Sequence, residues 1–424
     1  MGISDTPRGS YRCEDGTEFL VEWPSASAAD HAWRWNEDHH PVPFQPLMAA
    51  LDAGSKPGGQ RAYAEANVAP PPPFREWTVA NGFQYIRMSL LSPPEMGEYL
   101  ARAAALATLH GGPCRVWEAF SLPRVRDACD RLRALPVESP VEEASFLYDY
   151  AFQLTQVAGP TVLLPVLMAT TGLLTDVFGA EGGPLTHEVT QGGANDTIAS
   201  DQAIWEMAEL ARADVAVLGL VKAADAGAIE RLPVEHPFRR AFSAYIETYR
   251  WRGENWDPAS PTVGERPEGV LTLVGRGIGA PSPASTTDRS GGRRSETVAR
   301  IEAALEGDQA RLARFRELAG AFDGYVAVRE GRALWQLMAT GSLRHALLKK
   351  GATLAQRGVI EADDDVFFLL PGEVDSATSG TAADHRALVQ RRRADWEYWK
   401  AKRPPHHIGA AVPPGPLPFG TAVE

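Results

Sequence analysis

Apolar residues recur every three or four positions through most of the chain after Ser92, the spacing that gives a helix one apolar face. Trp205, Met207, Leu210 and Ala211 form one such stripe, of the kind that normally packs in a core. We therefore expect a mainly α-helical protein. The pattern predicts helices over residues 94–110, 123–135, 141–157, 160–178, 197–224, 235–250, 296–319, 327–356 and 384–402.

Residues 1–95 follow a different pattern. Residues 18–23 alternate between polar and apolar positions like a short strand. Two runs rich in β-forming residues, 74–80 and 83–88, flank Asn81-Gly82, a pair that tolerates the positive φ of a tight hairpin turn. The prediction is a small N-terminal β-hairpin region, a minor β component beside the helices.

Local composition suggests how the chain is divided. Residues 280–297 are rich in Ser, Thr, Gly and Arg and have almost nothing to bury, which is typical of a flexible linker. We expect an N-terminal segment with short strands and a hairpin (1–95), a helical lobe (96–279), the linker (280–297), a C-terminal helical lobe (298–403) and a Pro/Gly-rich tail (404–424).

Net charge and cysteine content exclude several classes of protein. The formal net charge is −12 and the sequence pI about 5.4, which argues against a general nucleic-acid binder. The three cysteines are widely spaced, so neither a disulfide framework nor a metal site is expected. No apolar signal region and no run of eighteen apolar residues are visible, so we expect a cytoplasmic protein without a membrane partner.

Arg329 and Arg332 carry the clearest candidate chemistry. They are three residues apart in the predicted helix 327–356, so their side chains share one face, whereas Glu330 is expected on another. A guanidinium group is planar, permanently charged and able to bind two oxygens of a phosphate. Trp335 belongs to an apolar strip on the same helix. The arginines either line an anion-binding pocket or lie on a solvated face with ordinary ion pairs.

Two neighbouring runs are weaker signals. The strand-like run 270–274 precedes Gly275-Arg276-Gly277, but the glycine spacing does not fit a dinucleotide-binding loop, so we reject that interpretation. The acidic run 363–365 precedes an apolar run, 366–369, for which we expect a strand.

Four blocks, taken together and in order, resemble the central, substrate-binding domain of the rifampicin phosphotransferase and phenylphosphate synthase group, relatives of phosphoenolpyruvate synthase. They cover residues 33–47, 195–208, 249–254 and 326–369. Two positions depart from the pattern of that group. Trp251 stands where the family usually has histidine, and Arg332 stands near a position often held by lysine.

The resemblance implies phosphoryl transfer from a phosphohistidine to a hydrophobic small molecule with a hydroxyl group. This chain would be the substrate-binding component of a split system, with no cofactor of its own. ATP and Mg would be bound by a separate ATP-binding protein, and a second separate protein would carry the phosphohistidine. Arg329, Arg332, His40 and Glu254 are the expected catalytic residues, and Gln45, Arg252, Trp251, His187 and Trp335 are expected to contact the substrate.

Two other functions stay open. The domain could work alone as a lyase, dehydratase or isomerase on an activated natural-product intermediate, since Trp251 replaces the usual histidine. It could also be a non-catalytic binding or resistance protein that sequesters a hydrophobic small molecule.

Overall fold

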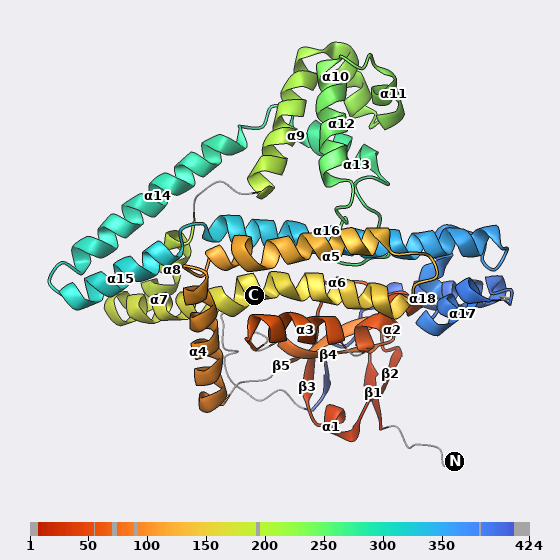
Figure 1. Ribbon diagram of the computed structural model, residues 1–424, viewed down its shortest axis with the longest axis horizontal. Helices are drawn as coiled ribbons and strands as arrows, with labels where there is room; N and C mark the ends of the chain where they lie inside the picture. Colours follow the sequence, from red (N-terminus) through yellow and green to blue (C-terminus); the bar gives the residue numbers. More distant parts are fainter. Residues whose placement is uncertain are drawn as a thin grey trace. The chain divides into compact units, whose positions relative to one another are not determined.

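The protein forms two compact units, which are described separately. A computed structural model describes residues 7–54, 56–69, 74–88, 92–191, 196–380 and 383–410. The first unit gathers three stretches of sequence, residues 1–55, 72–92 and 350–424. The second unit contains residues 56–71 and 93–349 (Figure 1).

The first unit contains most of the β structure. Its elements are β1 (Arg8–Arg12), β2 (Glu18–Glu22), α1 (Ala26–Ala29), β3 (Ala32–Trp35), α2 (Pro46–Ala53), β4 (Phe74–Ala80), β5 (Phe83–Met88), the 3-10 helix η4 (Asp363–Phe368), α17 (Pro371–Ser379), α18 (Arg386–Lys400) and β6 (His407–Gly409).

Two antiparallel sheets organise these elements. Strands β1 and β2 form a hairpin in which Ser10 faces Leu20. The second sheet has the order β4-β5-β3-β6, so the last strand among the described residues pairs with β3, in the N-terminal stretch. Asn81 and Gly82 have φ angles of 49° and 83°, which confirms the predicted hairpin turn.

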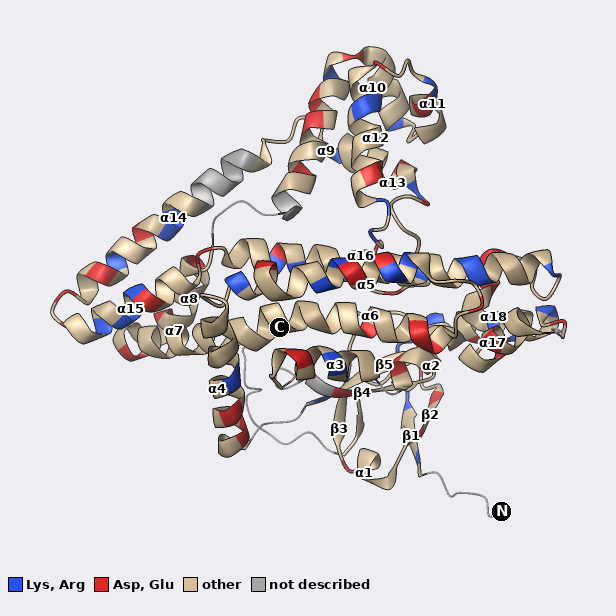
Figure 2. Ribbon diagram, viewed as in Figure 1, with Lys and Arg blue, Asp and Glu red and all other residues tan. Residues whose placement is uncertain are grey.

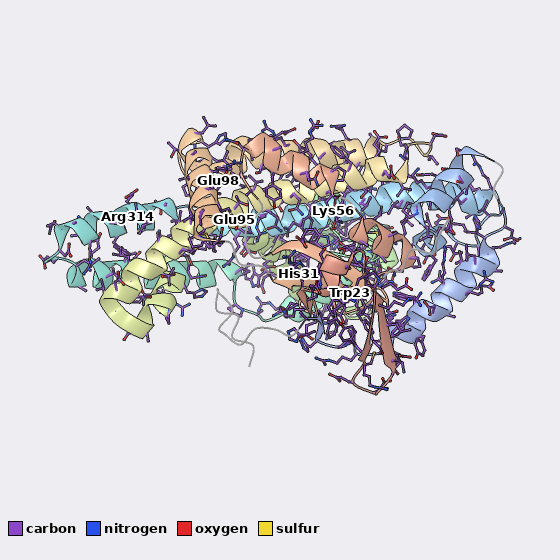
Figure 3. The ribbon with its side chains drawn as sticks, turned by 90° about the horizontal axis from the view of Figure 1, so that it is seen from below. Trp23, His31, Lys56, Glu95, Glu98 and Arg314 are labelled. Atoms are coloured by element: carbon purple, nitrogen blue, oxygen red, sulfur yellow. The ribbon has the colours of Figure 1, made fainter. Side chains whose placement is uncertain are left out.

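The core of this unit is rich in aromatic side chains. Phe19, Trp23, Trp33, Tyr85 and Ile408 are all buried in one cluster, and Trp23 is visible in Figure 3. Large aromatic side chains bury much apolar area per residue, so a small sheet can build a core from few of them.

The acidic run before Val366 forms a 3-10 helix, so the expected strand at 366–369 was wrong. Asp365 sets this geometry because its carboxylate accepts hydrogen bonds from the backbone N–H groups of Glu361 and Ala362, both at 3.0 Å. The same carboxylate pairs with Arg393 at 2.6 Å. The apolar residues that follow are buried in the helical turn, and burial alone does not distinguish a strand from a helix.

The second unit is helical. Its elements are α3 (Pro57–Ala66), α4 (Pro93–Leu109), η1 (Trp117–Ser121), α5 (Leu122–Ala134), α6 (Val141–Gln156), η2 (Val157–Thr161), α7 (Val162–Phe178), η3 (Gly179–Glu181), α8 (Gly182–Val189), α9 (Asp196–Ala213), α10 (Val215–Lys222), α11 (Ala226–Arg231), α12 (Pro237–Tyr249), α13 (Pro267–Gly277), α14 (Pro283–Ala304), α15 (Gln309–Ala321) and α16 (Tyr325–Gln356), whose last turns belong to the first unit. The expected fold class, mainly α with a minor β component, is therefore confirmed.

Apolar clusters of buried residues hold the described part of this unit together, and three of them each join several helices. The largest joins α3, α5, α6, α7 and α16 and includes Leu154, Val328 and Ala339. A second lies among α9 to α13, and a third lies among α7, α8, α14 and α15. Charged residues of both signs lie along the outer helices (Figure 2), where Arg316 of α15 pairs with Glu302 of α14 at 2.7 Å.

Two expectations of secondary structure were wrong in this unit. Helix α14 covers residues 283–304, most of the segment expected to be a flexible linker. Helix α13 covers the strand-like run 270–274, and its apolar residues Val270, Leu271 and Val274 are buried together. A short apolar run fits either structure, and tertiary packing decides between them.

Among the described residues, the helical stretch Val141–Val189 is long and apolar enough to cross a membrane by length and composition. An 18-residue window in it has a mean hydropathy of 1.7, and 44% of that window is buried. Leu154, Ala158 and Leu163 of this stretch belong to the largest core cluster, and a core helix passes the same test. The expected absence of a membrane partner stays a prediction.

Candidate functional site

Arg332 is the centre of the candidate site. It lies on α16 with part of its surface accessible. Its Nη1 donates a hydrogen bond to Oε1 of Gln156 at 3.1 Å. Within the described ranges, no carboxylate lies within ion-pair distance of this guanidinium. Gln156 is neutral, so the positive charge of Arg332 is hydrogen-bonded but not neutralised.

Gly159 makes this position of Arg332 possible. It belongs to the π-helical turn η2, which also contains Pro160. A Cβ atom at Gly159 would lie 2.4 Å from Cδ and 2.6 Å from Nε of Arg332. No other residue fits so close an approach, and π-helical turns often mark functional positions in helices.

Burial and neighbouring charges act on Arg332 in opposite directions. Burial lowers the pKa of Arg332 and the nearby Arg329 acts in the same sense, whereas Tyr325, Glu330 and Tyr63 act to raise it. An arginine stays protonated under these conditions. Burial also raises the pKa of Tyr63 and of Tyr325, so both phenols stay neutral. The site therefore combines one partly desolvated cation with two neutral hydroxyl groups.

Arg329 lies one turn before Arg332 and is more exposed. Its Nε donates to Oε1 of the adjacent Glu330 at 2.8 Å, and 40% of its side chain is accessible. The expectation that Glu330 lies on another face was wrong, because the flexible side chains of neighbouring residues bend toward one another. Arg329 is thus already paired, unlike Arg332.

Arg252 comes close to the same helix from the segment after α12. Its Nη1 donates to Oγ of Ser200 at 3.5 Å, and that hydroxyl is also bonded to the hydroxyl of Tyr245 at 2.9 Å. Burial and Glu330 raise the pKa of Asp201, whereas Arg252 lowers it. Because Asp201 is exposed, solvent screens these interactions. Arg252, Asp201 and Glu330 nevertheless form one electrostatic group, which links the start of α9 to α16.

Trp251 lies in a basic environment. The centroid of its ring is 4.6 Å from that of His345, and the guanidinium groups of Arg250 and Arg133 lie 4.8 and 5.6 Å from the indole centroid. Burial lowers the pKa of His345, as do Lys349 and the two arginines. The indole therefore lies between two guanidinium groups and the tilted ring of His345.

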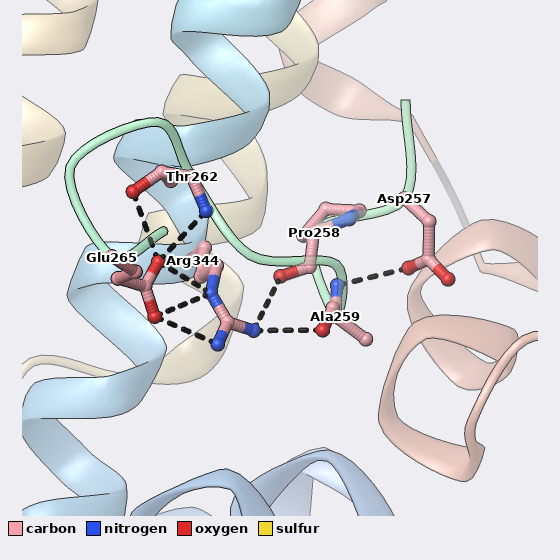
Figure 4. Close-up of polar contacts among 6 residues, drawn as sticks. All are labelled: Asp257, Pro258, Ala259, Thr262, Glu265 and Arg344. Atoms are coloured by element: carbon pink, nitrogen blue, oxygen red, sulfur yellow. Dashed lines mark hydrogen bonds and ion pairs between the residues drawn. The ribbon is translucent and has the colours of Figure 1, made fainter. Parts of the chain in front are cut away.

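The segment that carries these residues is fixed to α16 by Arg344 (Figure 4). Nε and Nη2 of Arg344 each donate to the Glu265 carboxylate at 2.8 Å, and Nη1 donates to the carbonyl oxygen of Ala259, also at 2.8 Å. Gly341 allows the backbone to approach, because a Cβ there would lie 1.9 Å from the carbonyl oxygen of Trp251. Trp251 and Arg252 are thus placed by a polar clamp in which Arg344 is buried and Glu265 is exposed.

Three other predicted site residues form no hydrogen bond or ion pair with Arg332 or Arg252 in the described structure. Glu254 is exposed, and its carboxylate forms no hydrogen bond or ion pair within the described part of the chain. His187 is exposed on α8, and its ring lies 3.4 Å from Nε2 of Gln191, one turn away. Trp335 packs against the largest core cluster and lies under the guanidinium of Arg126 at 5.3 Å. The roles predicted for them stay predictions.

The remaining two predicted residues belong to the first unit. The ring of His40 lies 4.6 Å from that of Phe44, and its backbone N–H donates to the carbonyl oxygen of Asn36 at 2.8 Å. Gln45 precedes α2, and its buried Oε1 accepts no hydrogen bond among the described residues. Their predicted roles also stay predictions.

Several residues of the site gave no signal in the sequence. Tyr63, Gln156 and Gly159 reach Arg332 from α3, α6 and η2, and the helical periodicity of these segments marks only their core positions. The adjacent Gly159-Pro160 pair is an available clue, since both residues disturb a regular helix. No group of three or more His, Cys, Asp or Glu residues in the described segments could hold a metal ion.

Comparison with known proteins shows that part of this chain is similar to a known family domain. Residues 160–330 match the model of the rifampicin phosphotransferase fourth domain. The chain is 29% identical over 222 residues to uncharacterized proteins of Mycobacterium tuberculosis and Mycobacterium bovis, covering 51% of this chain and 23% of theirs. It is 28% identical over 229 residues to a rifampicin phosphotransferase of a Streptomyces species, covering 50% of this chain and 26% of that enzyme.

These matches confirm the resemblance that the four sequence blocks indicated. The chain contains a rifampicin phosphotransferase-like domain, and the matched segment begins at the π-helical turn and ends two residues before Arg332. The chain spans about a quarter of the length of the curated relatives that it matches.

Proposed function

We propose that this chain binds a hydrophobic small molecule and positions one of its hydroxyl groups for phosphoryl transfer from a phosphohistidine on a separate protein. Arg332 carries this proposal. It is a partly buried guanidinium whose only hydrogen-bond acceptor in the described chain is the neutral Gln156. Such a cation is suited to the charge that spreads over the oxygens of a transferring phosphoryl group.

Arg329 has a supporting role in this proposal. Its ion pair with Glu330 is partly exposed, so exchange of that carboxylate for a phosphoryl oxygen costs little. The hydroxyl group of Tyr325 stays protonated and can donate a hydrogen bond to an anion, whereas that of Tyr63 already donates to Oε1 of Gln153 at 2.8 Å. ATP and Mg are required only to phosphorylate the donor histidine, and we propose that partner proteins hold them in the cytoplasm.

Reconstitution with a phosphorylated donor tests the proposal. The chain is mixed with the phosphohistidine-carrying part of the Streptomyces enzyme, ATP, Mg and its ATP-binding part, with rifampicin as the first acceptor and a panel of phenols as the next. Phosphorylated product is measured by mass spectrometry. We expect product only when this chain is present, and a loss of roughly 10²–10³-fold in rate for Arg332→Gln.

Arg314→Gln is the matched control, because Arg314 is an exposed arginine of α15 paired with Glu317. It should leave the rate within twofold. Equal rates for Arg332→Gln and the native chain would refute the assigned role of Arg332. Tight binding of an acceptor without any product would instead favour a binding protein.

A further inference from the structure

Helices α3, α5 and α6 line a half-open surface pocket of about 400 Å³, apart from the site at Arg332. Its volume lies in the range of small-molecule sites. Glu65, Pro123, Asp127 and Leu147 complete a lining formed mainly by three arginines and two aromatic residues. Those five are Arg61, Arg124, Arg131, Phe146 and Tyr150.

Helical periodicity brings these side chains together. Arg124, Asp127 and Arg131 are spaced by three and four residues, so they form one stripe on α5. Arg61 and Glu65 form the corresponding stripe on α3. The arrangement is therefore a property of three helix faces rather than of a loop.

The aromatic wall comes from α6. The rings of Phe146 and Tyr150 are nearly parallel, with an interplanar angle of 4°, and the guanidinium of Arg61 lies 6.0 and 5.5 Å from their centroids. The two rings give the pocket a flat apolar surface beside its cations. An inorganic ion gains nothing from contact with an apolar surface, whereas the apolar part of an organic anion can pack against it.

Glu65 holds part of the positive charge in place. It accepts hydrogen bonds from Arg61 Nε at 2.7 Å and from Tyr150 at 2.6 Å, while Arg124 Nε lies 3.8 Å away. Burial acts to raise the pKa of Glu65, but the hydrogen bonds from Tyr150 and Arg61 outweigh it and lower the pKa. Glu65 is thus ionised, and it competes with any bound anion for the arginines.

The α5 arginines are weakly paired. Arg131 lies 3.8 Å from Asp127, too far for a hydrogen bond, and in the described structure its side chain donates none. Among the described residues Arg124 donates only to the carbonyl oxygen of Phe120, at 2.8 Å, and its guanidinium lies 4.2 Å from the centroid of the Phe120 ring. Three arginines face two carboxylates, so the pocket has a formal charge of +1 on a chain whose net charge is −12.

We propose that this pocket binds a small phosphate monoester with an aromatic group. The phosphate would take hydrogen bonds from Arg124 and Arg131 on one side and from Arg61 on the other, and the ring would lie against Phe146 and Tyr150. The terminal oxygens of a tetrahedral phosphate point in three different directions, so they can accept from all three arginines. The two oxygens of a carboxylate lie in one plane and cannot do so. The site differs from the one at Arg332, and the proposal stands independently of the proposed phosphoryl transfer.

Calorimetric titration of the purified chain tests this site with phenyl phosphate as the probe. Inorganic phosphate, benzoate and phenol are titrated in parallel, and phenyl phosphate should bind at least tenfold more tightly than each of them. Arg131→Gln and Arg124→Gln should each weaken phenyl phosphate binding about tenfold. Glu65→Gln should strengthen it severalfold, because a competing negative charge is removed while an acceptor for Tyr150 is kept.

Arg314→Gln is again the control, since its side chain is 50% exposed, close to the 58% of Arg131, and it lies on α15 outside the pocket (Figure 3). It should change the affinity by less than twofold. Native affinity in both Arg131→Gln and Arg124→Gln would overturn the proposal. Loss of binding in Arg332→Gln with retention in Arg131→Gln would also overturn it, because the anion would then bind at Arg332.

Discussion

The two arginines of the first turns of α16 differ in a way that their spacing does not reveal. Arg329 is paired with Glu330, whereas Arg332 is partly buried against a helix turn and donates to an uncharged amide. A buried cation without a counterion costs stability, so its environment is expected to be built around it. Gly159 is part of this environment, because the absence of a Cβ atom leaves space for the Arg332 side chain.

Replacement of Gly159 by alanine tests this packing. The added Cβ would collide with Cδ and Nε of Arg332, so the guanidinium must move away from Gln156. We expect a loss of about 1–3 kcal/mol in the free energy of unfolding. Urea denaturation followed by tryptophan fluorescence gives this value.

Gly172 provides the matched control on α7, since a Cβ there meets no atom within 4 Å. Gly172→Ala should be neutral or stabilise the protein by up to about 1 kcal/mol, because alanine favours a helix more than glycine does. If both variants had the same stability as the native chain, the close approach of Arg332 would not constrain the fold.

At the scale of elements, the segment between α12 and α13 is held by a polar clamp built on the buried Arg344 of α16. Arg344 joins Glu265 to the carbonyl oxygen of Ala259, and Asp257 accepts a hydrogen bond from the N–H group of Ala259 at 2.9 Å (Figure 4). Burial raises the pKa of Asp257 to about 6, although Ala259 and Arg344 act against the shift. The ionised form of Asp257 is therefore a strained part of the clamp.

Asp257→Asn should stabilise the protein at neutral pH. The folded-state pKa of about 6 lies above the usual aspartate value of about 3.9, so the folded state binds more protons between these values. The free energy of unfolding then falls as the pH rises from about 4 to about 6, and the full cost, about 2–3 kcal/mol, applies above that range. Asparagine avoids this cost and still accepts from Ala259.

Urea denaturation of both proteins at pH 4 and pH 7.5 measures this effect. The variant should be more stable by about 2 kcal/mol at pH 7.5 and of equal stability at pH 4. An asparagine variant that is less stable than the native chain at pH 7.5 would mean that the ionised carboxylate has a favourable partner in the fold.

The periodicity of apolar residues in the sequence predicted the elements that bury one regular face. Helices α6 and α16 begin and end within two residues of the predicted limits, and the hairpin β4–β5 turns at its Asn-Gly pair. It failed for the apolar run of α13, which fits a buried strand or a buried helix equally well. It also failed for α14, whose polar composition resembles a linker although the helix continues to Ala304.

The candidate site was only partly predictable for a related reason. The type and spacing of Arg329 and Arg332 identify a cationic helix face, but Tyr63, Gln156 and Gly159 meet that face only through the packing of α3, α6 and η2. A neutral tyrosine or glutamine has no chemical signature until its partner is known. Contacts between helices that are distant in the sequence therefore decide which of the two arginines is partly buried and hydrogen-bonded to a neutral amide.

At the scale of the whole molecule, the first unit depends on contacts between the two ends of its sequence. Strand β6 pairs with β3 through Ile408 and Trp33, and Ile408 lies in the aromatic core with 1% of its surface exposed. The unit is built from three separate stretches, so its core cannot be completed until the last of them is in place. Such non-local pairing has a high cost in loop-closure entropy.

Ile408→Ala should therefore destabilise the first unit by about 2–5 kcal/mol, the usual range for removing a buried isoleucine side chain. The adjacent His407 is the control, because it is an exposed residue of the same strand, and His407→Ala should change stability by less than about 0.5 kcal/mol. Urea denaturation measured by tryptophan fluorescence includes a signal from this unit, since Trp23, Trp33 and Trp35 lie in the core that Ile408 completes. Equal effects of the two substitutions would show that burial of Ile408 in the C-terminal strand does not stabilise the core.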